Sequence, residues 1–333
     1  MNNSDKQPSL ALPLLASLLF SLVTPVSAKA KDIPEDSPAQ SFLTLSLKEL
    51  LNAKIITAAS GFEQKLKRAA ANGAVITKEE WQAFGARTLS DVLATVPGIH
   101  VTKSKVAYKH NIFSFRGLSG GFGEQVKVLI DGHPIELMQD GGRPIGFNLP
   151  LAMFKRVEVI KGPGSAVYGA DAFGGVINLV SHTAGDAPST LSASAGNFDS
   201  FGVSAQTSVS QGEHYFSFAL DYMKSDDDPG KVVSQDLQSN FDSLFATNVS
   251  NAPGVIDEHF DVLSLQAKWQ WKDLSFDFWQ WQNRDIGLGP GIAQALDMSG
   301  FARVKNSHVS GKWNLSRFIN SGDLQLAINW QQQ

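Results

Sequence analysis

Two glycine-rich stretches are the first places in the sequence where backbone amides could bind a charged ligand. Gly117, Gly120, Gly121 and Gly123 follow one apolar segment, and residues 162–169 follow another. A phosphate-binding loop ends in Gly-Lys-Ser/Thr or opens a long helix, and neither stretch does so. We therefore interpret these glycines as residues of tight turns, where the backbone needs a positive φ or approaches a neighbour closely.

Catalytic chemistry has little support in the residue types and their spacing. There is no Gly-x-Ser-x-Gly nucleophile elbow, and the seven histidines have no motif around them. The absence of cysteine excludes disulfides, thiolate zinc sites, iron–sulfur clusters and a cysteine nucleophile. The sequence therefore predicts a protein that is not an enzyme and has no bound cofactor.

A run of three acidic residues, Asp226, Asp227 and Asp228, lies in a long polar connection. Carboxylate oxygens are ligands that Ca²⁺ prefers, and such a run could also bridge lipopolysaccharide through a cation. The alternative is an ordinary solvated loop tip, because runs of like charge are usually exposed.

The overall charge makes nucleic acid a poor candidate partner. The chain has 28 basic and 32 acidic residues, so it lacks the basic excess that binding to phosphate backbones requires. Only 18% of its 333 residues are charged, against about a quarter in a typical soluble domain. We therefore expect that something other than water faces much of the surface.

The N-terminus predicts a secretory signal peptide over residues 1–28. Lys6 precedes an apolar stretch over residues 10–23, and small residues close it at Ala28. A membrane anchor would need about 20 apolar residues, whereas this stretch is shorter and contains Pro13. Elsewhere no apolar run is long enough for a spanning helix, so the mature chain is either soluble outside the cytoplasm or inserts as strands.

The elements of the second half are strands in which apolar and polar residues alternate. Every second residue is mostly apolar over 201–209, 216–222, 263–271 and 324–330. Strands with one apolar and one polar face fit a transmembrane barrel, and they also fit an antiparallel sheet with one wet face.

Tryptophans and loop lengths favour the membrane alternative. Six of the seven tryptophans lie in this half, mostly near predicted strand ends, as in an aromatic girdle: Trp269, Trp271, Trp279, Trp281, Trp313 and Trp330. Tight connections alternate with longer ones at 225–258 and 285–299, which is typical of short periplasmic turns and long extracellular loops. Trp279 and Trp281 are out of phase with Leu274, Phe276 and Phe278, which predicts a bulge or a misplaced strand boundary there.

The segment 53–182 has the pattern of a compact α+β domain. Thr77 with Glu80, and Thr88 with Asp91, predict the starts of two short helices. Asp131 and Gly132 predict a hairpin turn, since both central positions favour positive φ. Short strands are predicted at 99–102, 112–115, 126–130, 157–160 and 176–180.

These residues resemble the plug domain and the barrel start of a TonB-dependent outer-membrane receptor. The matching stretches, in the order and spacing of that family, are 86–93, 96–99, 115–117, 128–132, 156–169 and 172–178. The residues that carry the motif are Arg116, Gly117, Asp131, Gly132, Arg156, Glu158, Gly162, Pro163, Tyr168, Gly169, Gly175 and Asn178. The second half resembles the family only in its alternation of apolar and polar residues, and no sequence motif matches there.

The resemblance implies an organisation and a mechanism. It implies a lead-in over 29–53, a plug over 54–184 and an incomplete outer-membrane β-barrel over 185–333 of a Gram-negative bacterium. The stretch Lys54, Ile55, Ile56, Thr57 and Ala58 lies where such receptors carry the TonB box, which adds a strand to TonB. The alternative is a plug edge strand. The implied partner is the TonB–ExbB–ExbD complex, which supplies energy from the proton gradient, and the surrounding partner is outer-membrane lipid and lipopolysaccharide.

The resemblance also implies that ligands meet the plug apices, here 103–111, 118–124 and 136–147. These stretches hold a cationic and aromatic set suited to an anionic ferric chelate: Lys103, Lys105, Tyr108, Lys109, His110 and Arg143. His110 could instead be an axial haem ligand, although a lone histidine is more often structural. A ferric siderophore is thus the leading expectation, with haem or cobalamin as alternatives.

Length limits these expectations. After the signal and plug, about 150 residues remain, with seven candidate strands. Plugged transporters have about 22 strands, and seven could not enclose a plug. The expected fold is therefore an α+β plug domain followed by a partial antiparallel barrel, and the chain is expected to be C-terminally truncated and unable to transport alone. The alternatives of another class are an outer-membrane barrel enzyme and a secreted β-sandwich binding module.

Overall fold

The computed structural model describes residues 55–56, 64–65, 73–104, 111–118, 123–135, 142–144, 146–162, 164–289, 294–315 and 325–332. The chain divides into two compact units, 1–50 and 51–333, and all described residues belong to the second. The predicted signal peptide and lead-in lie outside the described residues.

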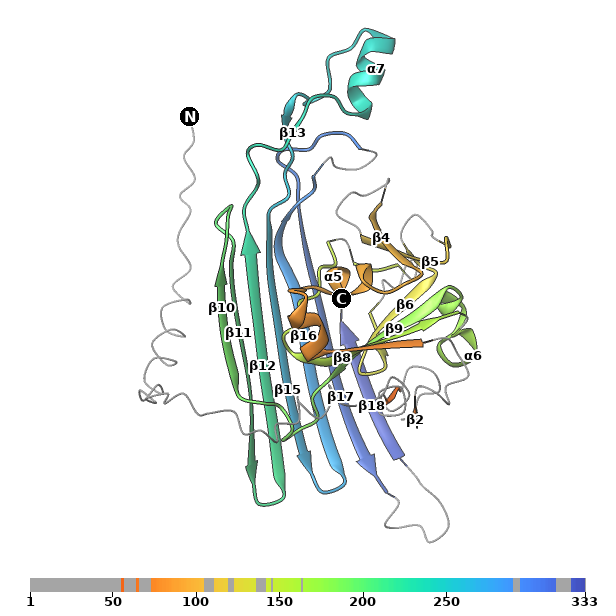
Figure 1. The fold of residues 1–333 in the computed structure, drawn as a ribbon, viewed down its shortest axis with the longest axis vertical. Helices are drawn as coiled ribbons and strands as arrows, with labels where there is room; N and C mark the ends of the chain where they lie inside the picture. Colours follow the sequence, from red (N-terminus) through yellow and green to blue (C-terminus); the bar gives the residue numbers. More distant parts are fainter. Residues whose placement is uncertain are drawn as a thin grey trace. The chain divides into compact units, whose positions relative to one another are not determined.

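The first half forms an α+β domain around a mixed five-stranded sheet (Figure 1). The strand order is β3 (Gly73–Thr77), β8 (Phe154–Lys161), β9 (Gly175–Ser181), β6 (Val126–Ile130) and β7 (His133–Pro134). Only β6 and β9 run parallel within it. A separate hairpin pairs β4 (Ile99–Lys103) with β5 (Asn111–Phe115). All five strands predicted in this domain are confirmed.

Two short helices pack on this domain, and both start at the predicted caps. Helix α4 (Lys78–Ala83) has a capping box between Thr77 and Glu80, and α5 (Leu89–Ala94) has one between Thr88 and Asp91. Their buried side chains join the main hydrophobic core with the strands: Trp81, Leu89, Val92 and Leu93. Helix α6 (Ser165–Tyr168) and the 3₁₀ turn η2 (Ala170–Ala172) connect β8 to β9.

The second half forms one antiparallel sheet of seven strands in sequence order. Its strands are β10 (Thr190–Ala195), β11 (Phe201–Gln211), β12 (His214–Ser225), β15 (Phe260–Trp271), β16 (Leu274–Gly287), β17 (Phe301–Asn314) and β18 (Gln325–Gln332). The long β12–β15 connection carries β13 (Val232–Val233), helix α7 (Leu237–Phe245) and β14 (Gly254–Val255), at the opposite end of the sheet from the tight β11–β12 and β15–β16 turns (Figure 1). The predicted loop alternation is confirmed, except that the β17–β18 turn lies outside the described residues.

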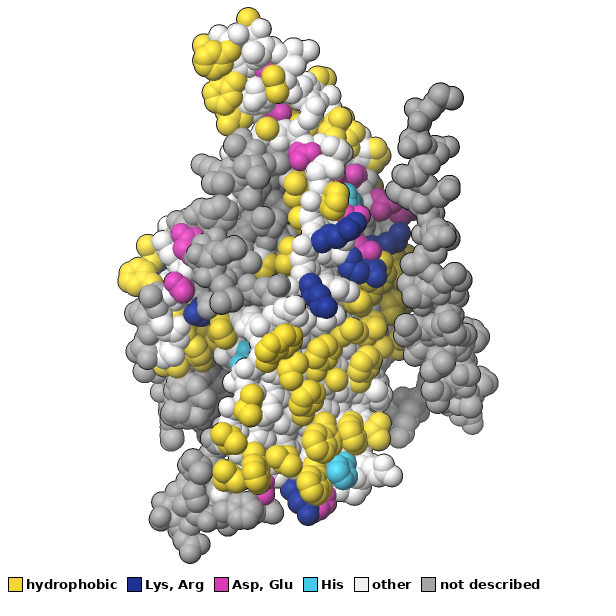
Figure 2. All heavy atoms as spheres, turned by 180° about the vertical axis from the view of Figure 1, so that it is seen from behind, with side chains coloured by type: hydrophobic (Ala, Val, Ile, Leu, Met, Phe, Trp, Pro, Cys, Tyr) yellow, Lys and Arg dark blue, Asp and Glu magenta, His cyan; other side chains and the backbone are white. Residues whose placement is uncertain are grey.

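The two faces of this sheet differ in polarity. The face toward the α+β domain, here called the inner face, buries polar side chains such as Gln206, Ser264, Gln266, Asn306 and Ser310. The outer face exposes apolar ones, and Figure 2 shows them as a band over the part of the sheet nearer the tight turns. An apolar outer face and a polar inner face are the pattern of a wall between lipid and a lumen. Among the described residues, no helix is both long enough and apolar enough to cross a membrane.

Trp279 and Trp281 correct two expectations. The pairing of β16 is continuous past both residues, and its register shifts lie instead between Asp261 and Val262 and between Asn283 and Ile286. Both tryptophans are buried at the inner face, where the Trp281 ring meets Phe147 edge-on at 5.5 Å. They are out of phase with Leu274, Phe276 and Phe278 because they face the α+β domain. They therefore do not belong to an aromatic girdle. Trp269, Trp271 and Trp313 do lie near the tight-turn ends.

Candidate functional site at the contact between the α+β domain and the inner face

The predicted hairpin turn of the α+β domain forms an ion pair with the sheet. Asp131 and Gly132 have φ of 49° and 84°, as the predicted turn requires. Lys268 of β15 places its Nζ 2.9 Å from Asp131 Oδ2 and 3.8 Å from Asp277 Oδ1. The backbone N–H of Ser181 donates to Asp131 Oδ1 at 2.8 Å, and the Ser181 hydroxyl donates to Oδ2. Burial alone would raise the pKa of Asp131, but the Lys268 charge and the Ser181 hydrogen bonds outweigh it and hold that pKa below its usual value.

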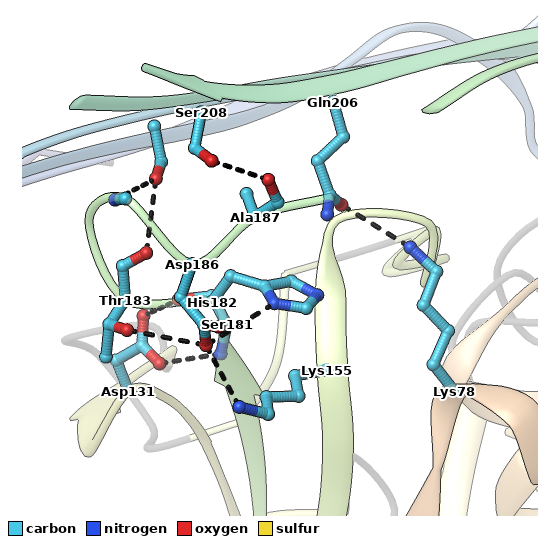
Figure 3. Close-up of polar contacts among 12 residues, drawn as sticks. Lys78, Asp131, Lys155, Ser181, His182, Thr183, Asp186, Ala187, Gln206 and Ser208 are labelled. Atoms are coloured by element: carbon cyan, nitrogen blue, oxygen red, sulfur yellow. Dashed lines mark hydrogen bonds and ion pairs between the residues drawn. The ribbon is translucent and has the colours of Figure 1, made fainter. Parts of the chain in front are cut away.

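A second contact joins the start of α4 to the sheet. Lys78 Nζ donates to the carbonyl of Ala152 at 2.6 Å. It also donates to Gln206 Oε1 at 3.4 Å (Figure 3). Burial lowers the pKa of Lys78. One ammonium group thus connects a helix, the segment before β8 and strand β11.

The segment that leads from the domain into β10, the first strand of the seven-stranded sheet (the wall), forms hydrogen bonds with the inner face of that sheet. The Ser217 hydroxyl donates to the carbonyl of Thr183 at 3.1 Å and accepts from the N–H of Gly185 at 2.9 Å. Ser208 donates to the carbonyl of Ala187 at 2.7 Å (Figure 3). The domain therefore has its exit segment held by hydroxyl groups of β11 and β12.

Near the loop end of the sheet, the contact is close and mixed in character. Asn283 Nδ2 donates to the carbonyl of Gly146 at 3.2 Å. Gly146 has φ of 67°, and a Cβ there would lie 2.1 Å from Ile286 Cδ1, so only glycine fits without rearrangement. Phe147, the next residue, packs on Trp281.

Two cavities lie beside these contacts. One of about 480 Å³ is lined by Gln82, Arg87 and residues of β10 to β12, and one of about 510 Å³ by Lys103, Asn111, Glu258 and Asn283. Thr88, Asp91, Asn148 and Phe260 line both. Spaces of this size between domain and wall are large enough for small-molecule groups.

The predicted ligand-contacting residues are not all where the sequence indicated. Lys103 is exposed at the end of β4 and lines the second cavity, whereas Lys105, Tyr108, Lys109 and His110 lie outside the described residues. Arg143 is 2% exposed, and its guanidinium donates to the carbonyls of Asn111 at 2.6 Å and Gly123 at 3.2 Å. It also lies 4.4 Å from the Phe113 ring centroid. Burial lowers the pKa of Arg143 to about 10, so it remains a cation that organises loops, and the prediction that it faces a ligand does not fit this placement.

The predicted TonB-box stretch is described only in part. Ile55–Ile56 forms strand β1, which pairs with β2 (Gln64–Lys65), and this ladder has two residue pairs. Lys54, Thr57 and Ala58 lie outside the described residues.

The remaining motif residues build the frame of the domain. Arg156 Nε donates to the buried carboxylate of Glu158 at 2.8 Å, Asn178 donates to the other Glu158 oxygen at 3.4 Å, and the Asn178 amide oxygen accepts from the N–H of Gly132 at 3.0 Å. This network connects β8 and β9 to the Asp131 turn. Of the other motif residues, Arg116, Gly117, Gly162 and Gly169 have positive φ, and Tyr168 is the last residue of α6. Pro163 lies outside the described residues. Gly175 has no room for a Cβ, which would meet the carbonyl of Ile160 at 2.6 Å.

Sequence reasoning missed the partners on the sheet side. Lys268, Gln206 and Asp277 contact or adjoin the domain, yet they read only as polar residues of amphipathic strands. A signal was present in Lys268, because a charged side chain on the inner face of a strand needs a partner there.

The arrangement defines a class of protein: an outer-membrane barrel wall with an α+β plug on its inner face. A family model, TonB-dependent Receptor Plug Domain, matches residues 65–176. The vitamin B12 transporter BtuB of Vibrio vulnificus is 39% identical over 168 residues, which are 50% of this chain and 24% of that protein. Residues 65–176 are thus the plug domain of a TonB-dependent receptor, and the strands that follow them have the fold of the barrel wall in solved receptors.

Solved structures share this fold at low sequence identity. The pyoverdine receptor FpvA of Pseudomonas aeruginosa PAO1 aligns with a TM-score of 0.59 at 16% identity, over 84% of this chain and 40% of that one. The ferric yersiniabactin uptake receptor FyuA of Yersinia pestis aligns with a TM-score of 0.53 at 17% identity, over 78% and 40%. The chain therefore spans about a quarter of the curated relative and two fifths of these structures.

Proposed function

We propose that this chain belongs to a receptor for the active uptake of a scarce nutrient, with a role in binding and transport rather than catalysis. The observation that carries the proposal is the set of polar contacts between plug and wall, the Lys268–Asp131 ion pair and the Lys78–Gln206 hydrogen bond, which lie beside the apolar packing of Trp281 on Phe147. Polar contacts can be exchanged for water at small net cost, whereas an apolar contact of the same size cannot. A plug seated in this way can stay closed at rest and move when it is pulled.

We propose that TonB supplies the pull, with ExbB, ExbD and the proton gradient behind it. The support is the short ladder between Ile55–Ile56 and Gln64–Lys65, since two residue pairs give a strand that a partner strand can capture by β-augmentation. The alternative, a permanent plug edge strand, predicts that substitution of Ile55 by proline weakens the fold without affecting TonB binding.

Among ligands, a corrinoid of the cobalamin type is our first candidate, because the curated relative at 39% identity is a vitamin B12 transporter. A ferric siderophore is the second, because Lys103 places a cation on the larger cavity between plug and wall. Haem rests on His110 alone, which lies outside the described residues. Arg143 no longer supports an anionic ligand, because its guanidinium is buried on carbonyl groups.

The test is uptake in the source bacterium after deletion of the gene. We expect loss of growth, and of radiolabelled cobalamin uptake, when cobalamin is limiting, and restoration by the gene carried on a plasmid. A defect confined to ferric siderophores would favour the second candidate. Normal growth and uptake on cobalamin, siderophores and haem would contradict the proposed function.

A further inference from the structure

The long connection between β12 and β15 brings its two ends together at the loop end of the sheet. Its first residues include Asp227, and its last include Asp257 and His259. The ligand atoms of these three side chains all lie within 4.8 Å of one another. Here they are called the loop cluster.

The backbone around the loop cluster holds its members in place. The Asp227 carboxylate accepts the N–H of Glu258, and Asp257 Oδ1 lies 2.5 Å from His259 Nδ1. Gly289 donates to the carbonyl of Asp257 at 2.7 Å, and Gly287 donates to that of His259 at 3.0 Å. Two residues of the loop and the end of β16 are therefore fixed to each other by main-chain hydrogen bonds.

The missing side chain of Gly287 leaves room for the carboxylate of Asp257. Asp257 is 8% exposed, and a Cβ on Gly287 would lie 1.7 Å from its Oδ1. The glycine at 287 thus makes it possible for a buried carboxylate to point at His259. A buried carboxylate is costly unless an opposite charge compensates it.

The charges around the loop cluster are out of balance. Asp285 Oδ1 lies 3.5 Å from His259 Nε2, so three carboxylates surround one imidazole. Of the basic side chains beside it, Lys231 and Arg284 form ion pairs with Glu258 and Asp261, and the charge of Lys103 also acts on Glu258. The excess of negative charge favours a divalent cation.

We propose that Asp227, Asp257 and His259 bind a divalent transition metal ion of the Zn²⁺ type, which ties the two ends of the long loop together. An imidazole nitrogen with carboxylate oxygens is a donor set that suits Zn²⁺, whereas Ca²⁺ takes six to eight oxygens. Asp285 does not bind the metal itself. It contacts the second ring nitrogen of His259, and a carboxylate at that nitrogen of a ligating histidine orients the ring.

This site differs from the calcium site that was one of the alternatives for the acidic run. Asp228 accepts the N–H of Gly230 at 2.8 Å within its own turn, and the backbone of Asp226 bonds to Phe198. Only Asp227 of the three turns toward the loop cluster. The metal would fix the base of the loop that carries α7, whose Phe241, Leu244 and Phe245 are exposed.

The test uses the full chain in detergent after treatment with a chelator, with Co²⁺ as a spectroscopic probe and Zn²⁺ as competitor. We expect one equivalent of Co²⁺ to give visible d–d absorption that Zn²⁺ removes, and protease cleavage within 226–259 to slow when Zn²⁺ is present. His259→Ala and Asp227→Asn should each weaken Zn²⁺ binding by at least about tenfold. Neither substitution removes a buried carboxylate, so the fold should persist, and circular dichroism checks this.

Asp228→Asn and His100→Ala are the matched controls, since they change a neighbouring carboxylate and an exposed histidine outside the loop cluster. Both should bind Zn²⁺ like the parent chain. The proposal is overturned if the parent chain binds neither Co²⁺ nor Zn²⁺, if the controls lose as much affinity as His259→Ala, or if Ca²⁺ binds and His259→Ala leaves that binding unchanged.

Discussion

The ammonium group of Lys268 and the carboxylate of Asp131 lie 2.9 Å apart, one on strand β15 of the wall and the other in the plug hairpin turn. We predict that Lys268→Met destabilises the chain by about 2–3 kcal/mol, because Asp131 keeps the Ser181 hydrogen bonds but loses its cation. Thermal unfolding in detergent measures the change. Lys272→Met removes an exposed pair with Glu213 and should cost less than about 1 kcal/mol.

The same pair gives a pH dependence with a defined sign. The pKa of Asp131 is held below its ordinary value of 3.8, so its contribution is present above about pH 4 and is lost as the pH falls further. The double variant Lys268→Met with Asp131→Asn should lose this dependence. Equal acid sensitivity in the parent and the double variant would show that other carboxylates dominate.

Gly175 is expected to be essential for the plug fold. A Cβ there would lie 2.6 Å from the carbonyl of Ile160 and 2.8 Å from the Phe115 ring, and both lie inside the core. Gly175→Ala should therefore destabilise the plug by about 2–3 kcal/mol or prevent its folding, as judged by protease resistance. Gly311→Ala is the control, because nothing lies within 4 Å of its Cβ position, and it should be neutral. A harmless Gly175→Ala would mean that β8 and β9 separate more readily than their pairing indicates.

Arg143 is expected to affect stability before it affects ligand binding. Arg143→Met removes the guanidinium donor from the buried carbonyls of Asn111 and Gly123, of which Gly123 keeps the N–H of Val126 at 3.3 Å, and this should cost about 2–4 kcal/mol. Lys103→Gln, at an exposed position on the larger cavity, should lower the unfolding temperature less than Arg143→Met does and should weaken binding of an anionic ligand. If Arg143→Met keeps the parent unfolding temperature and loses only ligand affinity, the role predicted from the sequence is the correct one.

Local signals in the sequence were sufficient for most of the fold. The two capping boxes and the Asp131 turn depend on residues within four positions of each other, and each formed as predicted. Four of the seven wall strands, β11, β12, β15 and β18, followed from alternation of apolar and polar residues over 201–209, 216–222, 263–271 and 324–330. Features of this kind need no knowledge of distant partners.

The site could not be predicted in the same way, because its contacts join distant residues. Asp131 and Lys268 are 137 positions apart, and their meeting depends on the register of β15 and on where the plug lies. Trp281 shows the same limit, since alternation cannot distinguish an apolar residue that faces lipid from one that faces Phe147. Arg143 lies in a loop-like stretch, and nothing nearby in sequence indicates that carbonyls 20 and 32 positions away would enclose it.

Asp236 is expected to hold two extracellular loops together. One of its carboxylate oxygens accepts the N–H of Ser239 at 2.7 Å, and the other accepts the N–H of Leu296 at 2.7 Å, in the β16–β17 connection. Asp236→Ala should lower amide protection from hydrogen exchange at both donors by at least about tenfold, because hydrogen bonds to a charged group are lost. The control Asp199→Asn, in the β10–β11 turn, should leave amide exchange at Ser239 and Leu296 unchanged.

Acid should have the same effect as that substitution, in a defined window. Burial would raise the pKa of Asp236, but the Leu296 and Ser239 amides and the hydroxyls of Ser250 and Ser239 outweigh it and lower the pKa to about 2. The stabilisation is therefore complete above the ordinary value of 3.8 and disappears as the pH falls toward 2. Pepsin, which cleaves at the exposed Phe241 and Leu244 of α7, should cut the parent chain progressively faster over this range relative to Asp236→Ala, which is already open. A constant ratio between the two chains would show that the carboxylate does not hold the loops.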